Sequence, residues 1–125
     1  MEWYGAEMIA SPIRILTRAK WIMEHHDFCL YHDPDRKYDG VARRADGLTI
    51  SAHSKIAAQF TLTGAVAKAV CDVTGEDWIV RHDDYAAAMR PLHERVSFNH
   101  MRFLRICDQM GKEKCIKLLE EVLTI

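Results

Sequence analysis

A cluster of imidazole and carboxylate side chains is the densest concentration of reactive groups in this sequence. Its members fall within eleven consecutive residues: His25, His26, Asp27, His32, Asp33 and Asp35. Imidazole nitrogens and carboxylate oxygens are ligands of zinc, iron and manganese, so one hypothesis is a small metal-dependent enzyme. Its ligands would be His25, His26, His32 and Asp33. The spacing follows no compact metal motif, neither two histidines four residues apart on a helix nor His-Glu-x-x-His. It therefore favours the alternative, a polar helix end that leads into a solvated loop.

A second polar group stands at the start of a helix predicted late in the chain. Its members are Asn99, His100, Arg102 and Arg105. Either Ser97 or Asn99 can cap that helix by accepting hydrogen bonds from its free N–H groups, which is a structural role. The imidazole and the two guanidinium groups would then form a small polar site beside the cap. We predict these four residues as a binding site, with no catalytic residue and no cofactor.

The balance of charge argues against nucleic acid as the main partner. The chain has 17 Lys and Arg against 18 Asp and Glu, a net charge of −1, whereas proteins that bind phosphates usually carry a basic excess. Two predicted helices around Gly111 have the outline of a helix-turn-helix, but Lys117 and Glu120 stand where that motif needs apolar residues. A role as a nucleic-acid accessory protein is kept as an alternative. It would use Arg43, Arg44, Arg102 and Arg105.

The cysteines are predicted to be reduced thiols, buried mostly as small hydrophobic side chains. They are Cys29, Cys71, Cys107 and Cys115, and no two have the spacing of a zinc knuckle or a redox motif. The first residues lack the basic and apolar stretches of a secretory signal. No apolar run approaches the ~20 residues that cross a bilayer. We therefore expect a cytoplasmic protein with no membrane partner.

Hydrophobic residues recur at helical spacing through most of the chain. Ser11 and Pro12 have the residue types of an N-cap and a first helical position. Helices are expected at 13–26, within 55–73, from residue 83 or 84 to 92, at 101–110 and at 112–123. Short extended pieces are expected at 28–31 and 47–51, and these could pair with each other. The sequence thus predicts a mainly α fold, a compact bundle of four to five helices with at most a small two-stranded β ribbon. It forms a single globular domain over 1–125.

The second of these helices is expected to be the most buried element. Thr61 or Thr63 can cap it, and Gly75 stands just past its expected end at Val73. Small residues four apart, such as Ala65 and Ala69, let another helix approach closely.

Three features together resemble a family of short phage and bacterial proteins described only as a domain of unknown function. They are the helix 13–26, the segment Phe60-Thr61-Leu62-Thr63-Gly64-Ala65-Val66-Ala67-Lys68-Ala69, and Ser97-Phe98-Asn99 before a final helix. The family has a Trp-Asn-Asp-like turn before its last helix, and this chain has Phe98-Asn99-His100 there. The resemblance implies a phage or prophage context, and it supplies no activity and no catalytic residues.

The leading functional hypothesis is a non-enzymatic binding protein that acts on a host or phage protein. It could be phage-encoded, for example as an inhibitor of a bacterial defence system. The small size, the complete core and the lack of an assembled catalytic motif favour it over the metal-dependent enzyme and the nucleic-acid accessory protein. A homodimer is a further hypothesis, because the apolar side chains of Trp3, Tyr4 and Met8 could join two copies of the chain.

Overall fold

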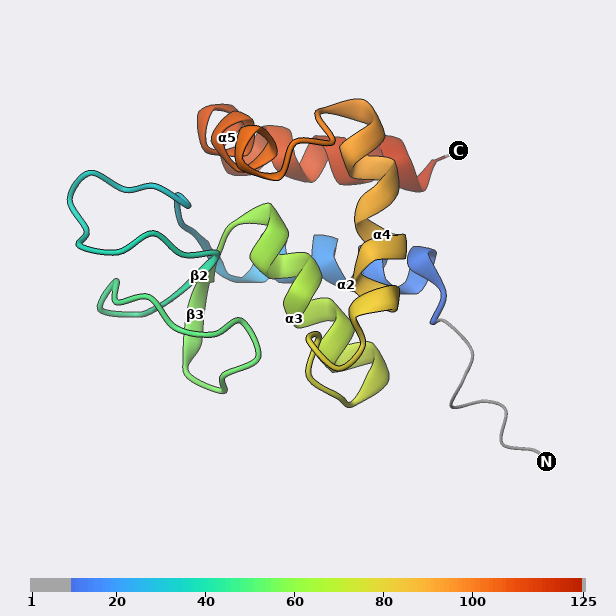
Figure 1. Ribbon diagram of the computed structural model, residues 1–125, viewed down its shortest axis with the longest axis horizontal. Helices are drawn as coiled ribbons and strands as arrows, with labels where there is room; N and C mark the ends of the chain where they lie inside the picture. Colours follow the sequence, from blue (N-terminus) through green and yellow to red (C-terminus); the bar gives the residue numbers. More distant parts are fainter. Residues whose placement is uncertain (1–9, 125) are drawn as a thin grey trace.

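The computed structural model describes residues 10–124, which contain four helices and a small sheet (Figure 1). The helices are α2 (Pro12–His25), α3 (Leu62–Thr74), α4 (His82–Arg95) and α5 (His100–Leu123). The strands are β1 (Asp27–Phe28), β2 (Ala42–Arg44) and β3 (Ala57–Phe60). The predicted mainly α class is confirmed, since the protein is 57% helical. Trp3, Tyr4 and Met8 lie outside the described residues.

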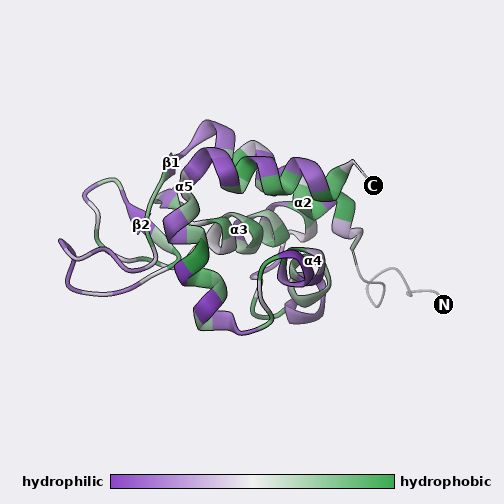
Figure 2. Cartoon of the chain, turned by 90° about the horizontal axis from the view of Figure 1, so that it is seen from above, coloured by the Kyte–Doolittle hydropathy of each residue, from purple (hydrophilic) through white to green (hydrophobic). Residues whose placement is uncertain are grey.

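The core is built around α3, which lies between the other helices (Figure 2). Ala65 and Ala69 are fully buried, as the small-residue pattern predicts. The predicted ends of this helix are also confirmed to within a residue. The Thr61 hydroxyl accepts a hydrogen bond from the Gly64 N–H at 3.0 Å, and Gly75 ends the helix in the left-handed conformation. Both the N-cap and the C-cap depend on residues within one helical turn, so they can be predicted from the sequence alone.

The sheet corrects the predicted two-stranded ribbon. It has three strands in the order β1-β3-β2, with β1 parallel and β2 antiparallel to the central β3. The expected pieces at 28–31 and 47–51 do not pair with each other, and no strand was predicted at β3, which directly precedes the helix capped by Thr61. Residues 57–60 form a strand because hydrogen bonds from both neighbours outweigh the helical preference of two alanines.

The structure has four helices in the described residues, whereas the sequence predicted four to five. The expected segments 101–110 and 112–123 form a single α5 with an interruption at Gly111, where φ is 82° and ψ is 176°. A positive φ is accessible to glycine because it has no Cβ. Gly111 therefore interrupts the helical conformation at the residue where the sequence predicts that the first of the two helices ends. The two segments, joined across this kink, are counted as the single helix α5, and the described residues contain four helices. None of the four offers the length of apolar sequence that a bilayer-spanning helix requires.

Gly64 allows the start of α3 to approach the segment before β2. A Cβ at this position would lie 2.0 Å from the Val41 carbonyl oxygen. That oxygen also accepts hydrogen bonds from the Thr61 N–H at 2.9 Å and from the Thr61 hydroxyl at 3.0 Å. The contact fixes the start of α3 against the loop that leads into the sheet.

Arg43 is a buried cation, with only 1% of its surface exposed. Its Nη1 donates to the Gly47 carbonyl and to the Thr49 hydroxyl, both at 3.2 Å. Its Nη2 donates to the carbonyls of Leu30 and Tyr31 at 3.4 and 3.3 Å. All four acceptors are uncharged oxygens. The guanidinium therefore links two loops that follow β1 and β2 in the chain.

Replacing Gly64 by alanine is expected to destabilise the protein by about 1–3 kcal/mol, because the new methyl group overlaps the Val41 carbonyl. Helix propensity alone predicts the opposite sign, since alanine is favoured over glycine by about 1 kcal/mol. Urea unfolding measures the change, and amide exchange at Thr61 should speed up as the carbonyl is displaced. A rise in stability would show that this close approach is not a constraint.

Replacing Arg43 by lysine is expected to cost about 3 kcal/mol, because one ammonium cannot reach acceptors on two loops and its charge stays buried. The matched control is Arg44→Lys on the neighbouring half-buried residue, which forms an ion pair with Asp46. Its effect should stay within about 0.5 kcal/mol. If both substitutions changed the free energy of unfolding in urea by the same amount, Arg43 would have no special role in stability.

Candidate functional site

The predicted binding residues lie together at the start of α5. Asn99 is the N-cap, and its side chain accepts a hydrogen bond from the Arg102 N–H at 2.9 Å. The Ser97 hydroxyl in turn accepts one from the Asn99 N–H at 3.1 Å. Asn99 is therefore engaged in capping. The side chains of His100, Arg102 and Arg105 are exposed, so they are the members of the predicted set that can meet a ligand.

Two hollows lie on either side of this helix start. The first, called the histidine pocket below, has a volume of about 400 Å³ and lies between α3, α4 and the beginning of α5. It is lined by Val41, Thr63, Ala67, Trp78, His82, Tyr85, Ala86, Met89, His93 and His100. The second, called the α5 hollow, has a volume of about 520 Å³. It is lined by Tyr31, His32, Asp39, Met101, Arg105, Asp108 and Gln109.

Two polar atoms in the histidine pocket are buried without a hydrogen-bond partner, namely Thr63 Oγ1 and His93 Nε2. Thr63 lies in the first turn of α3, where no helical carbonyl stands four residues earlier. In the last turn of the same helix, the Thr74 hydroxyl donates to the Val70 carbonyl at 2.6 Å. Leaving such a buried group unpaired costs about 1–3 kcal/mol. Buried orphan groups in a native protein call for an explanation such as a ligand.

His93 is held in its neutral form. Burial lowers its pKa below the ordinary value of 6.5, and the nearby imidazole of His100 lowers it further. The ring also packs edge-on against Phe103, with the two ring centroids 4.9 Å apart. At neutral pH, His93 therefore presents a neutral nitrogen to the pocket, which either donates or accepts a hydrogen bond according to its tautomer.

An aromatic pair forms another part of the pocket wall. The rings of Trp78 and Tyr85 lie with centroids 4.9 Å apart and planes inclined by 49°. Burial raises the pKa of Tyr85 to about 12, so its hydroxyl stays protonated. No Asp, Glu, Lys or Arg is among the described residues that line the pocket. It therefore offers hydrogen bonds and aromatic surface with little formal charge.

The α5 hollow is held in shape by Asp108. Its carboxylate accepts the N–H groups of Tyr31 and His32 at 2.7 and 3.0 Å, which ties the loop after β1 to α5. In that loop, Nδ1 of His32 lies 2.9 Å from Oδ1 of Asp39. Both carboxylates thus have partners within the protein. Arg105 lines the same hollow and forms no ion pair with any of residues 10–124.

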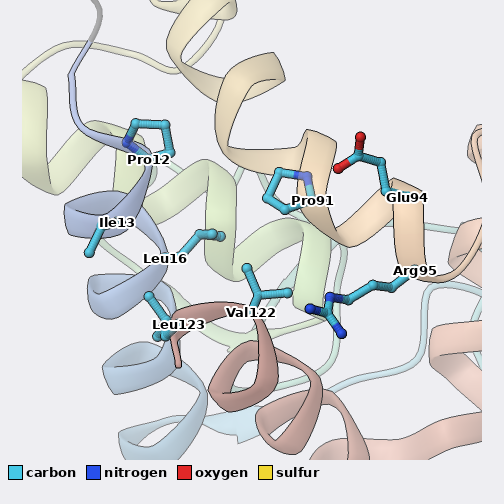
Figure 3. Close-up of a pocket in the computed structure, with 8 residues that line it drawn as sticks. All are labelled: Pro12, Ile13, Leu16, Pro91, Glu94, Arg95, Val122 and Leu123. Carbon is cyan, nitrogen blue, oxygen red and sulfur yellow. The ribbon is translucent and has the colours of Figure 1, made fainter. Parts of the chain in front are cut away.

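A third hollow, of about 470 Å³, lies between α2, α4 and the end of α5 (Figure 3). Most of its lining is apolar, including Ile13, Leu16 and Val122, and Glu94 and Arg95 are its charged members. It contains none of the unpaired buried polar atoms of the described residues.

The structure does not bring the four proposed metal ligands to one point. Nδ1 of His25 donates to the Trp21 carbonyl at 2.8 Å, and His26 meets Phe60 edge-on. His32 faces Asp39, and Asp33 accepts the N–H of Asp35 within the loop at 3.0 Å. Over residues 10–124, no three His, Cys, Asp or Glu side chains are grouped so that they could hold one metal ion.

Two of the four arginines proposed for nucleic-acid binding are engaged within the protein. Arg43 is buried among uncharged oxygens, and Arg44 is paired with Asp46. The cysteines are all free, and three of them are buried. Burial raises the pKa of Cys29 to about 12, so this thiol stays protonated and is a poor nucleophile.

Sequence reasoning missed the histidine pocket. The sequence pattern that could have indicated it is a row of residues along α4 at positions 82, 85, 86, 89 and 93. Side chains at this spacing of three and four residues share one helix face. The row mixes His and Tyr with Ala and Met, so it resembles a partly buried helix face. The partners on α3 and α5 lie at Thr63 and His100, and only the fold brings them to this face.

Comparisons with protein-family models, with curated proteins and with solved structures find no match to this chain. The resemblance to short phage and bacterial proteins of unknown function therefore stays an expectation from sequence motifs.

The stability of the protein is expected to fall as the pH drops below 6.5, in part because of His93. The unfolded imidazole takes up a proton there, whereas the folded one, with its lowered pKa, does not. The unfolded state then binds more protons and is favoured. Urea unfolding at about pH 7.5 and pH 5.5 should show a smaller loss of stability for His93→Gln than for the wild type.

The same mechanism can be followed at single residues by NMR titration. The pKa of His93 is lowered by its burial and by the nearby His100, and His100→Gln removes the second of these causes. The pKa of His93 should therefore move up toward 6.5. A wild-type His93 that titrates at or above 6.5 would contradict this description of the pocket.

Proposed function

We propose that this chain is a non-enzymatic binding protein that recognises a partner protein through the start of α5. The recognition surface, called the α5 surface, consists of Phe98, Met101, Arg102 and Arg105. The partner segment would carry carboxylates next to an apolar side chain. The resemblance to phage and bacterial proteins directs the search for that partner to host and phage proteins.

The observation that carries the proposal is the exposure of Phe98. A hydrophobic residue just before the N-cap commonly packs against the fourth helical residue, which here is Phe103. Phe103 is completely buried and meets His93 instead, while Phe98 is 68% exposed. Met101, three residues further along, is 46% exposed. Two large apolar side chains are thus presented to solvent at one helix start.

The charges beside these side chains indicate the kind of partner. Met101, Arg102 and Arg105 follow the spacing of one helix face, and Phe98 stands directly before the N-cap of the same helix. Arg102 and Arg105 are exposed and form no ion pair with any other described residue. Nearby carboxylates are already engaged, since Asp108 accepts two backbone N–H groups and Asp39 faces His32. Aromatic residues, Met and Arg are enriched at protein interfaces.

The α5 hollow extends this surface, because Met101 and Arg105 belong to both. A side chain of the partner can enter it, and anchors that fill a pocket near the centre of an interface contribute most to affinity. Catalysis is less well supported, since the described residues assemble no metal-binding group and no Ser, Thr or Cys of these residues lines this hollow beside the His32–Asp39 pair.

Site-specific photo-cross-linking tests the proposal. A cross-linking amino acid placed at Phe98 should capture a defined protein from a lysate of the native host. The same amino acid at Ile56, which is similarly exposed in the segment before β3, should not capture it. Capture of a second copy of this chain, or equal capture from both positions, would count against a distinct partner at the α5 surface.

Charge reversal provides the matched control. Arg102→Glu with Arg105→Glu should weaken binding of the captured protein about tenfold, since two ion pairs of about 0.7 kcal/mol each are lost. Lys114→Glu with Lys117→Glu makes the same change in charge on an exposed part of the same helix and should leave the affinity within about twofold. An unchanged affinity in the first variant would overturn the proposal.

A further inference from the structure

The histidine pocket lies on the other side of the helix start from the α5 hollow and is not needed for the function proposed above. We propose that it binds a small uncharged ligand, a planar heterocycle of one or two rings with a hydrogen-bonding edge, similar in size and chemistry to a nucleobase. The volume, the unpaired atoms, the charge and the aromatic wall each restrict the ligand.

The volume sets the size of the ligand. A pocket of about 400 Å³ falls within the range of small-molecule sites, which is roughly 300–1,000 Å³. It is at the lower end of that range, so one or two fused rings fit better than a larger cofactor. The exposed side chains of His82 and His100 belong to the same lining, so the pocket is open to solvent on that side.

The unpaired atoms set the pattern of hydrogen bonds. Thr63 is only 4% exposed, and its Oγ1 has no partner, as is also true of His93 Nε2. The hydroxyl both donates and accepts, and the neutral imidazole nitrogen does one or the other. A ligand edge that carries a donor beside an acceptor, as in a lactam or an amidine, satisfies both atoms.

The charge of the lining excludes ionic ligands. No carboxylate, ammonium or guanidinium of the described residues lines the pocket. Each of the two exposed histidines stands at a helix start, His82 on α4 and His100 on α5, and His93 is held neutral deeper in. Burying a charged group here would leave it without a fixed counter-charge, which is costly.

The aromatic wall requires a flat ligand. Trp78 and Tyr85 present ring surface to the pocket, and Met89 adds a polarisable thioether. Aromatic side chains bind nucleobases by stacking, because every base has a π face. A saturated ligand of the same volume would lose this contact.

Titration with hypoxanthine, adenine and uracil, followed by NMR at the Trp78 indole N–H and the His93 ring, tests the proposal. At least one base should shift both signals in a saturable manner. Indole, which has a similar ring size but only a donor, should bind at least about tenfold more weakly. No shift at either residue with any base, or tighter binding of benzoate than of the bases, would overturn the proposal.

Substitution of Thr63 by valine keeps the shape and removes the hydroxyl. The affinity for the bound base should fall at least about tenfold, while the stability should not fall, because the hydroxyl has no partner in the free protein. Thr74→Val is the matched control on the same helix: it loses a formed hydrogen bond and stability, and keeps the affinity. Unchanged affinity in Thr63→Val would overturn the assignment.

The source of the heterocycle is separated by comparing three forms of the base that binds. These are the free base, its nucleoside and a short single-stranded RNA that contains it. Binding of the free base and the nucleoside with similar affinity supports a small-molecule site. Binding of the RNA alone, weakening steeply with added salt, would overturn it in favour of contacts with the phosphate backbone.

Discussion

The buried guanidinium of Arg43 is the constraint on which the non-helical half of the molecule depends. Its donors connect the turn at Gly47 and the hydroxyl of Thr49 with the chain at Leu30 and Tyr31. A charge placed where only 1% of the residue is exposed is tolerated because four oxygen acceptors bind Nη1 and Nη2, whereas Nε is buried without a partner among the described residues. These contacts matter because the sheet itself is small, with strands of two to four residues. Such short strands contribute few hydrogen bonds of their own.

The position of the loops in turn decides where the two candidate sites lie. On one side, Val41 lines the histidine pocket and its carbonyl rests against Gly64 at the start of α3. On the other side, the chain at Tyr31 and His32 is fastened to α5 by Asp108. Lys112 adds a hydrogen bond to the His26 carbonyl at 2.9 Å. The first turns of α5 are thus held between two loops, and each face of that helix start borders a different hollow.

The two sites differ in the interactions they offer. The α5 surface presents to solvent apolar side chains and cations that form no ion pair within residues 10–124, which suits a macromolecular partner with complementary charge. The histidine pocket is concave and nearly free of formal charge, and its unpaired atoms suit a small neutral ligand. The two sites meet at adjacent residues, His100 and Met101.

The sequence by itself determined the helical class, the starts of α2, α3 and α5 and the end of α3, because caps act within a few residues. The ends of α4 (His82–Arg95) differ from those expected, and no side chain caps its start. Ser11, Thr61 and Asn99 accept N–H groups three residues ahead, and Gly75 and Gly111 take positive φ values. It also located Arg102 and Arg105, since their position at a helix start is local information. Only the tertiary structure decided that residues 57–60 form a strand, that Arg43 is buried and that Thr63 and His93 line the same pocket. Each of these depends on contacts between residues distant in the chain, and local spacing carries no record of such contacts.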